Sequence, residues 1–152
     1  MTTGLAPALH AAWAASTYRF QAGDQAYCLR IGQTQPAVDD WMRRQGWEAG
    51  AFLTHCNPLG VALDEATNAA RQQALLQQVT QAGWAAFAGQ GEPAPSSPWV
   101  AEPSLFILGL DAAAATALAL QGRQLGYLWH RLGQRTQLCL TGLQPAGETQ
   151  AG

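Results

Sequence analysis

Asn68 and Arg71 are polar residues on a predicted helix face that is otherwise apolar. The helix spans residues 65–82, and its apolar stripe, read backwards from Leu75 at helical spacing, reaches both of them. An unpaired buried guanidinium is strongly unfavourable, and a helix N-terminus favours anions. Two interpretations stay open: Arg71 and Asn68 bind a polar or anionic ligand, or Arg71 pairs with an internal carboxylate such as Glu102.

The segment at 54–58, Thr-His-Cys-Asn-Pro, follows a short apolar strand predicted at 51–54. Strand ends that face a helix N-terminus are common positions for binding sites in α/β folds. Asn57 can hydrogen-bond its own backbone and shape the turn before Pro58, or it can offer its amide to a ligand. Thr54 is the second candidate binding residue in this segment.

Three later polar residues can approach the same place. Glu102 and Ser104 lie at the start of an apolar run at 104–110, which is typical of a central strand buried on both faces. Glu102 can serve as a general base with a raised pKa or as the counter-ion of Arg71. Ser104 lacks a Gly-x-Ser-x-Gly motif, which argues against a hydrolase nucleophile. Gln124 follows a predicted helix and can orient a ligand or bridge backbone groups.

The three cysteines, Cys28, Cys56 and Cys139, are widely spaced and are expected to be reduced thiols. Cys56 would need a base to act as a nucleophile. Its neighbour His55 points the opposite way in an extended segment, so the fold would have to bring in His130. The histidines are dispersed and the cysteines are not clustered, so neither a metal nor a cofactor is expected.

Residues 88–98 are rich in Gly, Pro and Ser, which predicts a flexible loop. The Gly-Gln-Gly run at 89–91 is too short for a phosphate-binding motif. With Trp99 beyond it, the loop is interpreted either as a linker or as a lid that closes over a ligand.

The remaining pattern places these residues in one domain. It predicts further helices at 5–15, 36–45 and 112–121, and further strands at 17–20, 26–31, 84–87, 127–132 and 136–141. There are more strands than a pure βαβ alternation allows. The expected fold class is therefore α/β in the broad α+β sense, a mixed β-sheet with about four helices packed on it. We expect a single domain over residues 1–142 and a flexible C-terminal tail over 143–152.

The composition argues against two classes of partner. The chain has 152 residues, 48% of them hydrophobic, a net charge of −2, and eight basic residues that are all Arg. Neither nucleic acid nor an anionic membrane is an expected partner. No apolar run approaches the roughly 20 residues that cross a bilayer, and no basic residue precedes Arg19 as in a signal peptide. We expect a cytoplasmic protein, and the Arg-, Ala- and Gln-rich composition favours a bacterial source.

Several short motifs follow one another in a distinctive order: Thr54 with Asn57-Pro58, Asn68 and Arg71, Gly89 and Gly91, Trp99, Glu102-Pro103-Ser104, and Gln124. Over about residues 17–129 this order resembles a family of small bacterial proteins known as domain of unknown function 3293. The family's strand ends in Thr-Ala-aromatic-Asn-Pro, whereas His55-Cys56 stands here in place of the Ala-aromatic pair. This departure argues further against Cys56 as an essential nucleophile. The resemblance implies a residue set but no activity, cofactor or substrate.

Three functions stay open from the sequence. The first is binding of a small polar or anionic ligand in a cleft formed by the 54–58 loop, the N-terminus of helix 65–82 and the Glu102 region, with the binding residues Thr54, Asn57, Asn68, Arg71, Glu102, Ser104 and Gln124. The second is an acid–base enzyme with Glu102 as base and Arg71 as electrostatic stabiliser. The third is a structural or interaction protein with a buried polar network. The ligand, any reaction and the oligomeric state are left open.

Overall fold

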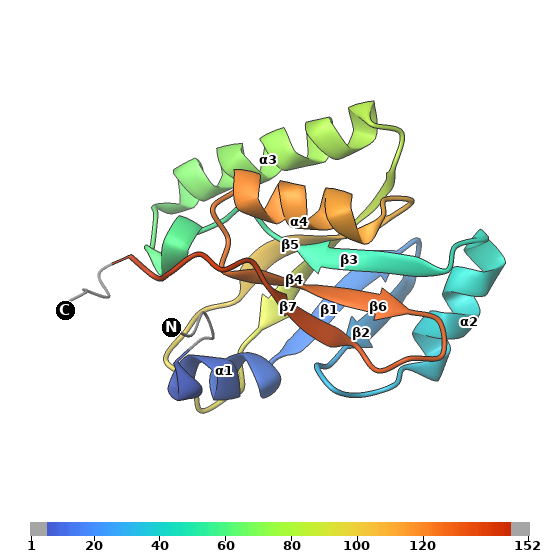
Figure 1. The fold of residues 1–152 in the computed structure, drawn as a ribbon, viewed down its shortest axis with the longest axis horizontal. Coiled ribbons are helices and arrows are strands. Elements are labelled where there is room, and N and C mark those ends of the chain that lie inside the picture. The colour runs from blue at the N-terminus through green and yellow to red at the C-terminus, as the bar shows by residue number, and fades with distance from the viewer. Residues whose placement is uncertain (1–5, 147–152) are drawn as a thin grey trace.

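The computed structural model describes residues 6–146, which form four α-helices and a seven-stranded sheet (Figure 1). The elements in chain order are α1 (Pro7–Ala14), β1 (Thr17–Ala22), β2 (Gln25–Leu29), α2 (Pro36–Gln45), β3 (Ala49–Leu53), a 3-10 turn (Pro58–Gly60), α3 (Glu65–Gln81), β4 (Ala85–Glu92), β5 (Glu102–Leu108), α4 (Ala112–Gln121), β6 (Gly126–Arg131) and β7 (Gln137–Leu140). This order and the α+β class confirm the prediction.

The strands lie in the order β2-β1-β4-β5-β3-β6-β7. Every pair of neighbouring strands is antiparallel, and one isolated bridge, between Ile31 and Thr136, is parallel. The expected mixture of directions is thus not found among the strand pairs of residues 6–146. The reason is topological. The connection through α3 joins β3 to β4, which run in the same direction, but β5 lies between them. The connection through α4 joins β5 to β6 in the same way, with β3 between them.

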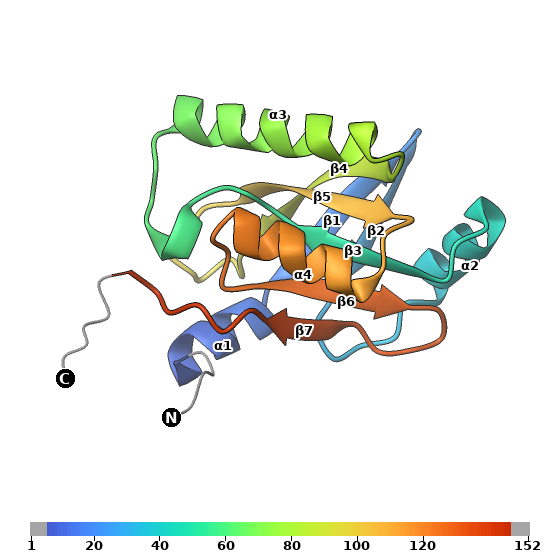
Figure 2. The same cartoon turned by 45° about the horizontal axis from the view of Figure 1, so that its top comes forward.

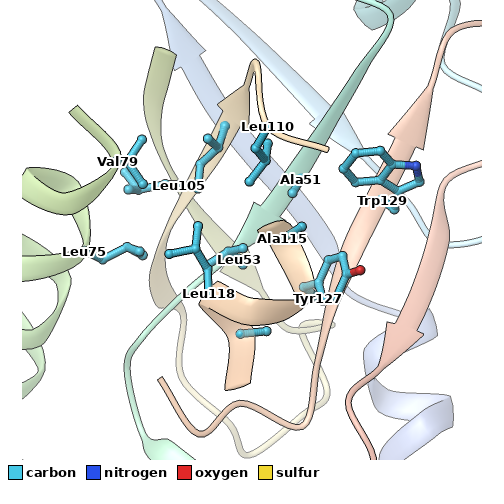
Figure 3. Packing of buried hydrophobic residues seen from close by; sticks show 12 residues of the cluster. Ala51, Leu53, Leu75, Val79, Leu105, Leu110, Ala115, Leu118, Tyr127 and Trp129 are labelled. Carbon is cyan, nitrogen blue, oxygen red and sulfur yellow. The ribbon is translucent and has the colours of Figure 1, made fainter. Parts of the chain in front are cut away.

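Helices α3 and α4 cover one face of the sheet (Figures 1 and 2). The first packs against β4 and β5, and the second against β3 and β6. Leu75 and Val79 of α3 and Leu118 of α4 meet Leu53 and Leu105 of the sheet in a buried apolar layer (Figure 3). This layer is one of two hydrophobic cores.

The opposite face of the sheet carries α2 and α1. Trp41 and Met42 of α2 are buried against Phe20 and Phe106 of the sheet, and the rings of Phe20 and Phe106 stack with centroids 4.5 Å apart. Helix α1 is different, because none of its residues is buried. The part of this face near α1 is therefore less completely filled than the part near α2.

Local sequence signals set the ends of the long helices. The side chains of Asp64 and Asp111 accept hydrogen bonds from Thr67 N at 3.0 Å and Ala114 N at 2.8 Å, which confirms both as N-caps of their helices. Gly46, at φ 83°, ends α2 in the left-handed conformation that glycine adopts easily. None of the helices between residues 6 and 146 has the length and apolar character needed to cross a membrane.

Residues 88–92 belong to β4 and not to a flexible loop, which corrects the prediction for 88–98. Gly89 pairs with strands on both sides of β4. A Cβ atom at Gly89 would lie 2.1 Å from the carbonyl oxygen of Arg19, so glycine is what allows β1 to approach β4 here. Only the shorter connection at 93–101 remains outside the strands.

Part of the predicted tail contacts the domain. Ala146 N donates to Leu59 O at 2.9 Å, and Pro145 lines the cavity described below. The rest of that prediction, residues 147–152, lies outside the described residues.

Candidate functional site

A cavity of about 570 Å³ lies between α1, the sheet and the 93–101 connection. Pockets of this size hold metabolite-sized molecules. Its polar lining includes Ser16, Tyr18, Thr54, Asn57, Glu102, Ser104, Gln124 and Tyr127, and its apolar lining includes Leu9, Trp13, Phe52, Trp99 and Leu128. Five of the seven candidate binding residues therefore meet at one cavity, whereas Asn68 and Arg71 do not line it.

Strand alternation directs Glu102 and Ser104 into this cavity. In β5, Leu105 packs in the core under α3 and α4, whereas Phe106 belongs to the core on the opposite face. Ser104 and Glu102 have the same parity as Phe106 and so face the side of α1. Thr54 follows β3 with the corresponding parity, and its Oγ1 donates to the carbonyl oxygen of Pro103 at 2.6 Å.

Asn57 connects α3 to the cavity. Its backbone is left-handed, at φ 48° and ψ 61°, a conformation that asparagine tolerates better than most residues. Its Nδ2 donates to Glu102 Oε2 at 2.8 Å. Its Oδ1 accepts from Asn68 Nδ2 at 2.8 Å and from Leu63 N at 2.9 Å, and its own N–H donates to Asn68 Oδ1 at 2.9 Å. Asn68 thus positions Asn57, and Asn57 positions Glu102.

Glu102 is the only carboxyl among residues 6–146 that lines the cavity. Burial raises the pKa of Glu102, and the hydrogen bond from Asn57 offsets this only in part. No described residue donates to Glu102 Oε1. Because Gln72 Nε2 is the only buried side-chain N or O atom of residues 6–146 without a partner, Glu102 Oε1 must be accessible to solvent. The carboxyl therefore has one oxygen held by the protein and one oxygen free.

Arg71 binds backbone carbonyls and not a carboxylate. Its Nε donates to His55 O at 2.6 Å and its Nη2 donates to Gly122 O at 3.0 Å. Among residues 6–146 it forms no ion pair, so the interpretation that it pairs with Glu102 is wrong. The physical reason is the sheet itself: α3 covers one face and Glu102 projects from the other. Arg71 ties the loop after β3 to the turn before β6.

Gln124 also bridges backbone groups. Its Nε2 donates to Cys56 O at 2.9 Å and to Gly122 O at 3.1 Å. Unlike Arg71, Gln124 lines the cavity, and its Oε1 accepts no hydrogen bond from residues 6–146. Of the two interpretations of this residue, these contacts fit the bridging one.

Gln72 is a supporting residue that the sequence interpretation missed. Its Oε1 accepts from His55 N at 3.1 Å and lies 3.3 Å from Thr54 Oγ1, so it holds the end of β3 from the side of α3. A signal was present in the sequence, because Gln72 follows Asn68 by four residues and so shares its helix face.

His55 and Gly122 form a second contact that the sequence interpretation missed. His55 Nε2 lies 2.8 Å from Leu118 O and therefore carries the proton, since a carbonyl only accepts. Burial lowers the pKa of His55. A Cβ atom at Gly122 would lie 2.2 Å from the His55 ring, so glycine is required for this packing. No local pattern links the two residues.

Aromatic residues form much of the cavity wall. Tyr18 Oη donates to Trp13 O at 2.8 Å, and burial raises the pKa of Tyr18 to about 12. Trp99 is 48% exposed and lies at the edge of the cavity. Tyr18 lies two residues before the buried Phe20 and so shares its strand face, which was a signal available in the sequence. Nothing local placed Trp13 beside Tyr18.

The cysteine nucleophile hypothesis is contradicted. Cys56 has no exposed surface, and burial raises the pKa of its thiol. His130 is also fully buried, with Nε2 2.7 Å from Asp39 Oδ1 and Nδ1 2.9 Å from Thr136 Oγ1. Both ring nitrogens are occupied in the core near α2, so His130 cannot act as a base for Cys56.

Residues 53–125 match the family model described as "Protein of unknown function (DUF3293)". No curated protein and no solved structure matches the chain. The matched segment runs from the last residue of β3 to the residue before β6 and includes all seven candidate binding residues. Over this segment the match confirms the family of unknown function that the order of the motifs predicted.

Proposed function

We propose that the protein binds a small molecule with an apolar body and a polar end in the cavity between α1 and the sheet. The observation that carries the proposal is the placement of Glu102 in that cavity with Oε1 free. Thr54, Asn57 and Ser104 surround it and are linked through hydrogen bonds to the Glu102–Pro103 segment. A few fixed polar groups in a largely apolar pocket are typical of small-molecule sites.

The apolar part of the cavity supports the same proposal. Trp13 and Trp99 border open space together with Phe52 and Leu128, which are buried members of the core that includes Trp41 and Met42 of α2. Protein interiors are close-packed, so an open volume of this size beside buried side chains favours a ligand that completes the packing.

The ligand proposed here differs in one respect from the one expected from the sequence. No Arg, Lys or His among residues 6–146 lines the cavity, and the Arg71 guanidinium binds carbonyl oxygens instead. The N-terminus of α3 is also absent from the lining. We therefore retain a polar ligand and no longer propose an anionic one.

A thermal-shift screen of a metabolite library tests the proposal with two neighbouring substitutions in β4. Gly91 lines the cavity, and a Cβ atom there would meet the Tyr18 ring at 3.5 Å, an ordinary contact. Gly91→Val adds volume inside the cavity. Gln90→Val is the matched control, because adjacent strand residues project from opposite faces. We expect ligands that raise the melting temperature of the wild type and of Gln90→Val but not of Gly91→Val.

Equal stabilisation of both variants would place the ligand elsewhere and contradict the proposal. A library without any stabilising compound would also contradict it. Circular dichroism of the two variants shows whether both remain folded before the screen is compared.

Acid–base catalysis by Glu102 is a second candidate function. The specific observation in its favour is a carboxyl that lines a cavity, has one free oxygen and has a pKa raised by burial. Arg71 is not an electrostatic stabiliser in this mechanism, because it does not line the cavity. Conversion of a bound ligand by the wild type, and its loss in Glu102→Gln with binding retained, would distinguish an enzyme from a binding protein.

A further inference from the structure

We infer that the polar end of the ligand is a cation, a protonated amine held by Glu102 Oε1 within the aromatic wall of the cavity. This inference rests on the proposed binding function and specifies its ligand class. Three features of the lining carry it: the direction of its hydrogen bonds, its charge and its aromatic faces.

The hydroxyl donors of the lining are already used. Four of its five hydroxyl groups donate to backbone carbonyl oxygens, at distances of 2.9 Å for Ser16, 2.8 Å for Tyr18, 2.6 Å for Thr54 and 3.1 Å for Ser104. The fifth, that of Tyr127, pairs with Thr116 Oγ1 at 2.7 Å in the core under α4. Each oxygen still has lone pairs, so these groups can accept a hydrogen bond from a ligand more readily than donate one.

The side-chain amides lead to the same result. Both N–H groups of Gln124 Nε2 donate to carbonyls, and Asn57 Nδ2 donates to Glu102. The oxygens Glu102 Oε1 and Gln124 Oε1 accept nothing from residues 6–146. Apart from the indole N–H groups of the walls and one N–H of Asn57, the free side-chain capacity of the lining consists of acceptors. A primary ammonium, with three donors and no acceptor, matches such a lining.

The charge of the lining also favours a cation. Glu102 is the only charged group among the described residues of the lining, and its burial disfavours the carboxylate, as the raised pKa reflects. A cation at Oε1 would offset that cost and form a charge-assisted hydrogen bond. The side chains of Trp13, Tyr18 and Trp99 add aromatic rings, whose faces attract cations. An anion would find neither a donor-rich lining nor a positive charge.

Three probes with the same aryl-alkyl body test this: phenethylamine, 2-phenylethanol and 3-phenylpropanoate, which are cationic, neutral and anionic at neutral pH. Their affinities are measured by calorimetry or NMR titration for the wild type, Glu102→Gln and Glu48→Gln. The amide oxygen introduced by Glu102→Gln can still accept the hydrogen bond from Asn57, so the variant is expected to fold. Glu48 is exposed and absent from the lining, which makes it the matched control for a lost carboxylate.

The expected result is that the amine binds the wild type and Glu48→Gln more tightly than the alcohol does, and that the carboxylate binds weakest. Glu102→Gln should weaken the amine roughly tenfold or more, a change of about 1.4 kcal/mol, and leave the alcohol unchanged. Equal binding of amine and alcohol, or an amine affinity insensitive to Glu102→Gln, would overturn the cation inference while leaving the cavity as a binding site. If none of the three probes bound the wild type, the inference and the proposed binding function would both be contradicted.

Discussion

At the scale of single residues, Glu102 has the most unusual surroundings in the cavity. One of its oxygens accepts from Asn57 at 2.8 Å, the other accepts no hydrogen bond from residues 6–146, and burial raises its pKa. The nearby titratable groups that sense its charge are Tyr18 and Cys56, and burial raises the pKa of both. Those two groups therefore stay neutral over the range in which Glu102 ionises.

The pH dependence of stability should report this carboxyl. As the pH rises above the ordinary pKa of glutamate, the unfolded chain releases the proton while the folded protein keeps it. The contribution of Glu102 to the free energy of unfolding should therefore fall with rising pH until the raised pKa of the folded carboxyl is passed. Relative to Glu102→Gln the wild type loses stability across this window, as urea unfolding at a series of pH values would measure.

The difference in the free energy of unfolding between the wild type and Glu102→Gln cancels the contributions of other groups that titrate in the same pH range. His55 changes stability with pH in the opposite direction to Glu102. Its pKa is lowered in the folded protein, so its contribution to stability is lost as the pH falls. A wild type that gained stability over Glu102→Gln with rising pH would show that the pKa of Glu102 is not raised.

At the scale of elements, β4 shows how glycine can indicate a strand as well as a loop. The sequence pattern around Gly89 and Gly91 predicted flexibility, but both residues pair with β1 and β5. Gly89 has no space for a side chain, because its Cβ would meet the Arg19 carbonyl oxygen at 2.1 Å. At Gly91 the nearest atoms to a Cβ belong to the Tyr18 ring at 3.5 Å.

Alanine substitutions at these two positions should therefore differ in their effect. Gly89→Ala forces β1 away from β4 and should lower the free energy of unfolding by roughly 2–4 kcal/mol. Gly91→Ala should change it by no more than about 0.5 kcal/mol. Chemical denaturation of the two variants measures this. Similar losses at both positions would mean that β1 does not approach β4 as closely as described.

At the scale of the whole molecule, the sheet separates a supporting layer from a cavity layer. Arg71, Asn68 and Gln72 lie on the α3 side and bind the loop after β3. Glu102 and Ser104 project from the other face toward α1. Asn57, at the end of β3, is the connection between the layers. Part of the network predicted as a ligand site is therefore structural, and the other part lines the cavity.

Substitutions in the two layers should separate stability from binding. Arg71→Ala removes charged hydrogen bonds to two carbonyls and should lower the free energy of unfolding by about 2 kcal/mol or more. Trp99→Ala, at a half-exposed position, should leave stability within about 0.5 kcal/mol and weaken the amine probe roughly two- to fivefold. Urea unfolding and titration of the amine provide the two readouts. A stable Arg71→Ala protein that no longer bound the amine would contradict the supporting role of Arg71 and show that it takes part in binding.

Local signals in the sequence were sufficient for the order of the helices and strands. Asp64 and Asp111 cap the beginnings of α3 and α4, and Gly46 ends α2, all where expected. These signals are local, because the interactions span only a few residues. The apolar stripe of α3 correctly placed Asn68 and Arg71 on its inner face. The strand ends and the length of β4 were less well predicted, since cross-strand pairing extended β4 through Gly89 and Gly91.

Only the tertiary structure decided which candidates belong together. Side chains of a strand alternate between two faces, and the face that each α-helix covers depends on the strand order, which is a property of contacts distant in sequence. Because β5 lies between β3 and β4, Glu102 faces α1 while Arg71 remains on the side of α3. The sequence by itself determined the elements and a set of polar residues. The pairing of the strands decided that Arg71 supports a loop and that Glu102 lines a cavity.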